Sequence, residues 1–114
     1  MADAPMIVRS WRGRASLAKR DAYPAHFAHG VLSALRGIEG FLGASLLREI
    51  EGDTVEFLVL TRWTSLAAIR AFAGEDLGRA VVEPEAVAAL TSFDPRVRHY
   101  EVVQEVAAGH TPPG

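Results

Sequence analysis

The segment TVEFLVLTRW (residues 54–63) constrains the fold most, because its apolar run Phe57-Leu58-Val59-Leu60 has no polar interruption. A strand with one face in water alternates apolar and polar residues, whereas a continuous apolar run indicates that both faces are covered. FLGASLLREI (41–50) contains a second such pair, Leu46-Leu47. The few helices of a chain of 114 residues can cover only one sheet face. The pattern therefore predicts a homodimer in which the same sheet face of each subunit packs against the other.

The first half of the chain predicts a strand followed by a helix. MIVRSW (6–11) is expected to form a short strand that Gly13 closes, and Ser16 can cap the helix that follows. Pro24 either kinks this helix or restarts it after a first turn. The helix is expected to end at the Gly37–Gly40 pair and to bury one stripe of side chains, formed by Tyr23, Phe27, Val31 and Leu35.

The second half predicts a strand hairpin, two short helices and a closing strand. Residues 41–50 and 54–63 flank Glu51-Gly52-Asp53, a hairpin turn in which glycine supplies a positive φ. Thr64 or Ser65 caps the next helix, which Gly74 ends. Pro84 can open a last helix through Leu90, and VRHYEVVQEV (97–106) is expected to be the closing strand.

Composition and charge exclude several classes of protein. The chain has no cysteine, which rules out disulfides and thiolate metal sites, and its formal net charge is -2. Arg9, Arg12 and Arg14 are interpreted as a solvated strand end, so no nucleic-acid partner is expected. No signal peptide and no membrane segment are seen, so we expect a soluble, cytoplasmic protein. One domain is expected over 1–114, with a core at about 6–106 and a loose tail at 107–114 that contains a solvated His110.

Over about residues 6–104 the chain resembles the antibiotic biosynthesis monooxygenase (ABM) family. The resemblance rests on MIVRSWRGR, on EGDTVEFLVLTRWTSLAAIRAFAGED, and on EPEAV with FDPRVRHYEVV. It implies an α+β fold with a ferredoxin-like, antiparallel four-stranded sheet and helices on one face. It also implies a dimeric α+β barrel with a pocket in each subunit between the sheet and the helices.

The resemblance also implies a role for Trp63 that this chain cannot fulfil in the usual way. In the cofactor-free branches a tryptophan at this position works with an asparagine, but the sequence contains no asparagine. The heme-degrading branch adds a ligating histidine after the tryptophan, and residues 64–98 contain none. We therefore expect no cofactor. Trp63 itself is either packed against the helix that follows it or is a wall of the pocket.

Several other side chains are candidates for the same pocket. His99 and Tyr100 are adjacent in a strand and must point to opposite faces. We favour His99 toward the helices as a catalytic base and Tyr100 at the dimer interface, although the reverse assignment is open. Arg79 is either a polar anchor for a ligand or a surface charge. The remaining expected substrate contacts are Tyr23, His26, Phe27 and Phe57.

A three-histidine metal site formed by His26, His29 and His99 is the less favoured alternative, so no metal is expected. The favoured function is a cofactor-independent monooxygenase, or a related isomerase or cyclase, that acts on a small apolar or aromatic molecule of phenolic or polyketide-like type. The alternative is a non-catalytic dimer that binds a small molecule or has a structural role.

Overall fold

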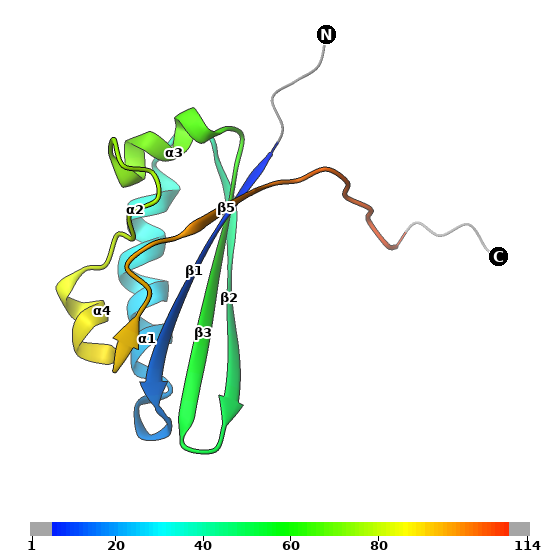
Figure 1. Cartoon of the computed structure of the whole chain (residues 1–114). Helices are drawn as coiled ribbons and strands as arrows, with labels where there is room; N and C mark the ends of the chain where they lie inside the picture. The colour runs from blue at the N-terminus through cyan, green and yellow to red at the C-terminus, as the bar shows by residue number, and fades with distance from the viewer. Residues whose placement is uncertain (1–5, 110–114) are drawn as a thin grey trace, which may run out of the picture.

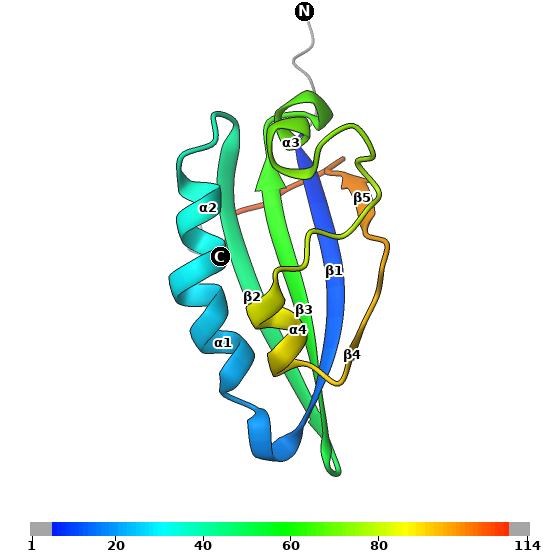
Figure 2. The same ribbon diagram turned by 90° about the vertical axis from the view of Figure 1, so that its left-hand side faces the viewer.

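A computed structural model describes residues 6–109, which form one antiparallel sheet with helices on one face (Figures 1 and 2). The strands are β1 (Ile7–Ser16), β2 (Phe41–Glu51), β3 (Thr54–Trp63), β4 (Ser92–Phe93) and β5 (Arg98–Glu101). The helical elements are η1 (Leu17–Lys19), α1 (Ala22–His26), the π-helical turn η2 (Phe27–Val31), α2 (Leu32–Arg36), α3 (Leu66–Ala73) and α4 (Pro84–Ala89). None of the helices in this part of the chain is long and apolar enough to cross a membrane.

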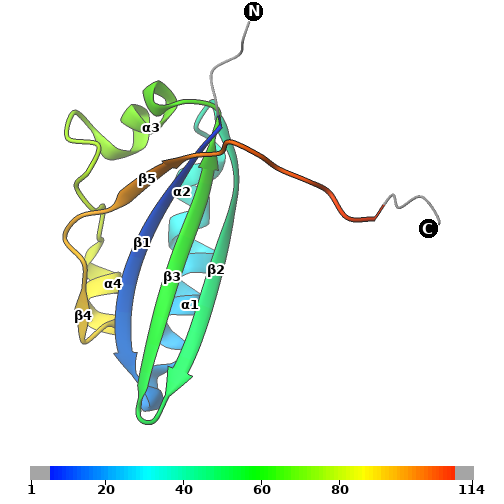
Figure 3. The ribbon, with the colours of Figure 1, turned by 45° about the vertical axis from the view of Figure 1, so that its right-hand side comes forward.

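The sheet has the strand order β2-β3-β1-β4, and β5 also pairs with β1. Both β4 and β5 are antiparallel to β1, with β4 opposite Gly13 and Arg14 and β5 opposite residues 7–10. These two short strands share the edge of β1 that β3 leaves free, so together they fill the fourth position of the sheet (Figure 3). The predicted ferredoxin-like arrangement is confirmed, with its last strand divided at residues 94–97.

Side chains on the long strands alternate between the two faces of the sheet, as the pleat requires. In β3 the buried residues are Val55, Phe57, Val59, Thr61 and Trp63, and the residues between them are partly exposed. β1 pairs with β3 in register, from Ile7 opposite Trp63 to Ser16 opposite Thr54. Its odd-numbered residues therefore face the helices, and its even-numbered residues face the opposite side.

The predicted end of the first strand at Gly13 is wrong, because β1 continues to Ser16. Gly13 is buried within the strand, where an added Cβ would lie 3.0 Å from Leu90 Cδ1 and 3.1 Å from the Trp11 ring. The glycine thus makes room for side chains that cover the sheet and does not mark a turn.

The first helix begins later than predicted. Ser16 makes no side-chain capping bond, and η1 precedes α1, which begins at Ala22. The helix thus restarts after a first turn, as one alternative expected, but Pro24 is the third residue of α1 and not the first; its missing N–H is not needed in this first turn. The predicted stripe of buried side chains is found. The π-helical turn η2 interrupts it, and Val31 is only partly buried. Gly37 ends the helix as expected.

The hairpin and the caps in the second half agree with the predictions. Gly52 has a φ of 60° between β2 and β3. The Ser65 hydroxyl accepts a hydrogen bond of 3.2 Å from the Ala68 N–H at the start of α3, and Gly74, with a φ of 80°, ends that helix. Pro84 is the first residue of α4, which ends one residue before the predicted Leu90.

The predicted closing strand over 97–106 is too long, because β5 ends at Glu101. Glu101 is opposite Ile7, the first residue of β1, and the Val102 N–H donates one further bond of 2.9 Å to the Met6 carbonyl. Beyond that point β1 offers no further pairing within residues 6–109. Residues 103–109 then run away from the sheet, with Val103 85% exposed and Val106 83% exposed (Figure 1). His110 lies outside the described residues.

Gly40 is the glycine whose replacement we expect to be most harmful. Its φ is +95°, and an added Cβ would lie 2.5 Å from the Ala68 Cβ and 2.8 Å from Thr64 Oγ1. We predict that Gly40→Ala lowers the free energy of unfolding by roughly 1–3 kcal/mol, because both the backbone and the packing oppose the methyl group. Gly37→Ala is the control, since a methyl group at that position would have no atom within 4 Å and the backbone φ is -87°. Urea titrations of both variants measure the difference, and equal stability of the two would contradict the prediction.

Candidate functional site

A small cavity lies between the sheet and the helices, on the face where the odd-numbered residues of β1 and β3 point. Its volume is about 50 Å³, enough for one or two water molecules. Most of its walls are apolar or aromatic, and the polar members come from the sheet and from α1. The lining residues are Arg9, Trp11, Tyr23, Val31, Leu35, Val59, Thr61, Phe72, Val81 and Val97.

A larger groove of about 380 Å³ lies next to this cavity. The two spaces share the side chains of Val31, Phe72 and Val81, so these residues stand between the interior and the groove. The other lining residues of the groove are Ala34, Ile38, Ala71 and Glu83. The groove is within the range of roughly 300–1,000 Å³ that small-molecule sites occupy, whereas the inner cavity alone is not.

Arg9 is the buried cation of this cavity, and its side chain is only 5% exposed. Nη1 donates to the Leu77 carbonyl at 2.6 Å, and Nη2 donates to the Arg79 carbonyl at 2.9 Å. The guanidinium carbon also lies 5.7 Å from the centre of the Phe72 ring. The interpretation of Arg9 as part of a solvated strand end is therefore wrong. Arg9 is an odd-numbered residue of β1 and faces the helices.

Arg12 and Arg14 are on the other face of the same strand, and there the expectation of a polar, partly solvated position holds. Arg12 pairs with Glu56 at 3.2 Å, and Arg14 pairs with Asp94 at 2.9 Å. Arg9, by contrast, has no carboxylate within 4.0 Å among residues 6–109. Burial lowers the pKa of Arg9 to about 10, so the guanidinium still carries its charge near neutral pH.

His99 lies beside Arg9, and its Nε2 is 3.0 Å from Arg9 Nη1. Because a guanidinium has only donors, Nε2 must accept this bond, and the proton of the neutral ring is then on Nδ1. Burial, and secondarily the charge of Arg9, lower the pKa of His99 below its ordinary value. The favoured orientation of His99 toward the helices is confirmed. Tyr100 is opposite Val8 on the other face of the sheet and is 50% exposed.

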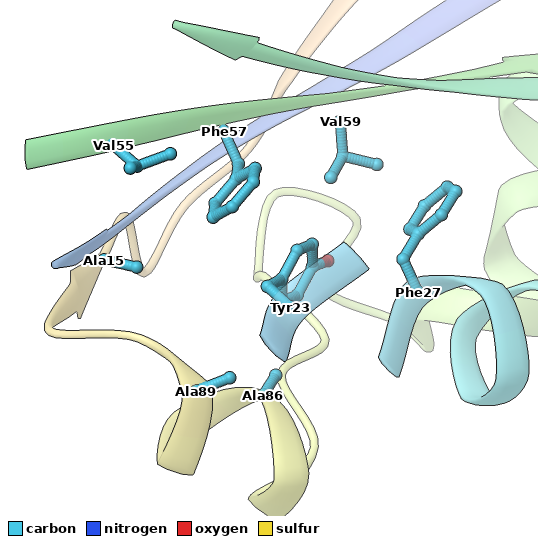
Figure 4. Packing of buried hydrophobic residues seen from close by; sticks show 8 residues of the cluster. All are labelled: Ala15, Tyr23, Phe27, Val55, Phe57, Val59, Ala86 and Ala89. Atoms are coloured by element: carbon cyan, nitrogen blue, oxygen red, sulfur yellow. The ribbon is translucent and has the colours of Figure 1, made fainter. Parts of the chain in front are cut away.

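Tyr23 joins the cavity to the main apolar core. It lines the cavity, and its ring centre is 5.3 Å from that of Phe57 and 6.4 Å from that of Phe27. Figure 4 shows this ring between the side chains of β3 and the alanines of α4. Phe27 and Phe57 are core residues and are not among those that line the cavity or the groove. Burial, and secondarily Glu83, raise the pKa of the Tyr23 phenol, so it stays protonated.

Trp63 lies in a second apolar cluster and is fully buried. Its ring packs edge-on against Phe41 and lies 6.1 Å from Phe72, centre to centre. The indole N–H donates to Thr61 Oγ1 at 2.8 Å, so that donor is already used. Trp63 therefore packs behind Thr61 and Phe72, which line the cavity, and does not itself line it. This position corresponds to the packing alternative.

The remaining sequence candidates line neither the cavity nor the groove. His26 Nε2 is buried without a hydrogen-bond partner and lies 3.5 Å from Glu83 Oε1. The side chain of Arg79 is exposed. Arg79 contacts the site only through its backbone carbonyl, which accepts a hydrogen bond from Arg9. His29 is also exposed. In the part of the chain that the structure describes, no three His, Asp or Glu side chains converge to hold a metal ion.

Sequence reasoning missed Arg9 and Trp11 as cavity residues. Both are odd-numbered members of β1, so the alternation Ile7, Arg9, Trp11 on one face was the available signal. The indole N–H of Trp11 donates to the Asp94 carbonyl at 2.8 Å, and its ring lies 5.8 Å from that of Tyr23. Trp11 is therefore the tryptophan that borders the cavity.

Comparison with known proteins agrees with this architecture. A profile of the family "Antibiotic biosynthesis monooxygenase" matches residues 6–84, whereas a search of curated proteins gave no significant match. A similar solved structure is the heme-degrading protein Rv3592 of Mycobacterium tuberculosis, with 27% identity, 93% of this chain and 100% of that chain covered, and a TM-score of 0.64.

Two oxygenases of Streptomyces also have similar structures. SnoaB, a cofactor-independent oxygenase from Streptomyces nogalater, is 22% identical, covers 94% of this chain and 100% of its own, and has a TM-score of 0.58. The monooxygenase ActVA-Orf6 of Streptomyces coelicolor, solved with nanaomycin D, is 19% identical, with 96% and 94% covered and a TM-score of 0.57. At these identities the two structures show the fold. Because the family profile matches well over half of the chain, this protein belongs to the antibiotic biosynthesis monooxygenase family.

Proposed function

We propose that the protein is a cofactor-independent monooxygenase that acts on a small, largely apolar molecule of phenolic or polyketide-like type. The observation that supports this most is the pairing of Arg9, which lines the largely apolar cavity, with His99, whose Nε2 lies 3.0 Å from Arg9 Nη1 although His99 is not itself among the lining residues. A charged donor and a neutral imidazole placed together can remove a proton from a substrate and hold the resulting anion.

The chemistry needs only substrate and oxygen. A phenol that loses its hydroxyl proton becomes electron-rich at a ring carbon and can transfer electrons to O₂. One oxygen atom then ends as a ring carbonyl and the other leaves as water, which carries the two hydrogens lost from the O–H and C–H bonds. His99 Nε2 is the proposed base. The substrate hydroxyl must take the place of Arg9 Nη1 on that nitrogen, because the Arg9 N–H now occupies its lone pair.

Heme is the cofactor that one structural relative degrades, and the residues here do not fit it. A histidine that serves as an axial ligand needs a free imidazole nitrogen at the site. His99 Nε2 is bound to a guanidinium, and His26 Nε2 faces Glu83 outside the residues that line the cavity. The segment 64–98 contains no histidine. We therefore derive no step through heme.

A non-catalytic small-molecule-binding dimer is the second candidate. Two observations favour it: the inner cavity is only about 50 Å³, and the chain has no asparagine to hold a substrate enolate as in the cofactor-free branches. Such a protein would use the same groove and cavity to hold its ligand. Turnover separates the two candidates.

We also propose that the protein is a homodimer formed through the helix-free face of the sheet. This face carries an apolar strip of even-numbered residues of β1, β3 and β5 together with the odd-numbered Leu47 of β2, which pairs with Leu58; Leu47 is 44% exposed and Tyr100 is 50% exposed. The strip consists of Val8, Leu47, Leu58, Leu60 and Tyr100. Figure 1 shows all the helices on the opposite side of the sheet, so no helix of the described chain covers this face. A second copy would bury these side chains against an identical strip.

Oxygen consumption tests the catalytic proposal. With electron-rich phenols and hydroquinones as substrates, we expect the wild type to take up oxygen and His99→Ala to be roughly 10²–10⁴-fold slower, the usual contribution of a general base. His29→Ala, which changes an exposed histidine, is the matched control and should behave like the wild type. If the wild type consumes no oxygen but retains a ligand in native mass spectrometry, the binding function is the correct one.

The buried His99 also predicts a pH dependence of stability. Its pKa in the folded protein is below the ordinary 6.5, so the unfolded chain binds the proton more readily. The stability that the neutral ring contributes is complete above pH 6.5 and is lost as the pH falls toward the folded pKa. Urea unfolding at several pH values should show this loss in the wild type and a smaller loss in His99→Gln, which keeps an acceptor for Arg9 but does not titrate. Parallel pH curves would rule the prediction out.

Sedimentation equilibrium tests the dimer. We expect the wild type to be dimeric at micromolar concentration and Leu58→Lys to be monomeric, because the dimer would bury the new charges without partners. Leu66→Lys is the control, since Leu66 is 45% exposed but lies on α3 on the helix side. A monomeric wild type, or equal dissociation of both variants, would contradict the proposed interface.

A further inference from the structure

We propose that the ligand of this site carries an ionised oxygen on an aromatic framework, as a phenolate or a carboxylate, and that the guanidinium of Arg9 binds this oxygen. The inference deepens the proposed function, on whose site it rests. It names the charge state of the ligand and the residue that recognises it.

The first argument is the charge balance around Arg9. The groups that face it are the carbonyls of Leu77 and Arg79, the neutral ring of His99 and the face of Phe72. The other polar side chains that line the cavity are the hydroxyl of Thr61 and the protonated phenol of Tyr23. Glu83 lies at the groove, next to His26. No anion within residues 6–109 therefore neutralises this buried charge, and a buried charge without a counter-ion is unfavourable.

The second argument is the supply of hydrogen-bond donors. A guanidinium has five N–H groups in a fixed planar arrangement. Three are used by the two carbonyls and by His99, so two remain without an acceptor in the described part of the chain. Because Arg9 lines the inner cavity, a ligand that enters it meets these donors. Planar, paired donors suit the oxygen atoms of a carboxylate or a phenolate.

The third argument concerns the rest of the ligand. Trp11, Tyr23 and Phe72 give the cavity aromatic walls, and the groove beyond Phe72 is mostly apolar. The inner cavity of about 50 Å³ has room only for the oxygen-bearing end of a molecule. The ring system must then extend past Phe72 and Val81 into the groove of about 380 Å³. The site therefore selects a flat apolar body with one negative end.

The first experiment compares two probes of nearly equal shape on the wild-type protein. We expect 2-naphthoate to bind at least tenfold tighter than 2-naphthamide in isothermal titration calorimetry at pH 7, because only the carboxylate neutralises Arg9. Equal affinity for the two probes, or no binding of either, would rule out the carboxylate form of the proposal.

The second experiment distinguishes phenolate from carboxylate recognition. 4-Nitrophenol ionises near neutral pH, and only its anion is yellow, so its absorption spectrum reports the ionisation state of the bound probe. We expect the protein to favour the bound anion about 10- to 1,000-fold, as an adjacent cation does for an acidic oxygen. A preference for 2-naphthoate alone assigns the site to carboxylates, and a preference shown by both probes assigns it to ionised oxygens in general. An unchanged ionisation of nitrophenol together with equal naphthalene affinities contradicts both forms.

Substitutions of single arginines identify the residue that binds the anion. We expect Arg9→Met to abolish the preference for the anion, Arg9→Lys to keep part of it, and Arg70→Met, an exposed arginine on α3, to leave it unchanged. Loss of the preference in Arg79→Met with retention in Arg9→Met would overturn the assignment. Because Arg9→Met also loses two hydrogen bonds to the backbone, its folding is checked by circular dichroism. If it does not fold, the paired probes on the wild type decide the proposal.

These results are independent of turnover. If the protein binds 2-naphthoate more tightly than 2-naphthamide but consumes no oxygen, the inference stands and the monooxygenase proposal is wrong. If the protein consumes oxygen but binds neutral and anionic probes equally, the monooxygenase proposal stands and the inference is wrong.

Discussion

A single buried guanidinium connects the sheet to the irregular segment that forms one wall of the cavity. Arg9 is the third residue of β1, and its two bonds to the carbonyls of Leu77 and Arg79 tie this segment to the sheet. Two backbone bonds of 2.9 Å each, between residues 78–80 and 95–97, fix the other side of this segment. Hydrogen bonds from a charged donor contribute more than neutral ones, about 1.5–3 kcal/mol each, and here they take the place of a strand ladder.

The alternation of β1 explains why one strand can serve two surfaces. Its odd-numbered residues place Arg9 and Trp11 at the cavity, whereas Arg12 and Arg14 form ion pairs on the helix-free face. β3 alternates in the same register, with Phe57 in the core and Leu58 on the proposed interface. A shift of one residue in this pairing would exchange the two surfaces, so the site and the interface depend on the same register.

Local signals in the sequence were sufficient for much of the fold. The hairpin at Gly52, the serine cap of α3 and the proline start of α4 each depend on residues close together in the chain, and each was predicted. The burial of Arg9 and the early end of β5 depend on contacts between distant strands. A charge near a strand end usually faces water, and only the pairing of Arg9 with residues 61 and 99 shows that it does not.

The candidate site was predicted less well than the fold, because it too depends on contacts between distant strands. Tyr23 was correctly expected in the buried stripe of its helix, and His99 was correctly expected to face the helices, because a helical stripe and a strand alternation limit their directions.

The two tryptophans show where the family resemblance helped and where it did not. It drew attention to Trp63, yet the N–H of this residue is satisfied by Thr61 and its ring is enclosed by the core. The tryptophan that borders the cavity is Trp11, whose direction follows from the alternation of β1 opposite β3.

The burial of Arg9 changes what the absence of asparagine implies for the chemistry of the proposed site. An amide holds an oxyanion by a hydrogen bond from a neutral dipole, and it adds no net charge. A guanidinium in an apolar site offers hydrogen bonds and a full positive charge, which interacts more strongly where the effective dielectric constant is low. Burial and, secondarily, the same charge lower the pKa of His99, so the imidazole is kept in the form that can accept a proton. In the proposed site a chain without asparagine can thus still stabilise an oxyanion, and the arginine proposed for this role lies beside an imidazole that burial and its charge keep neutral.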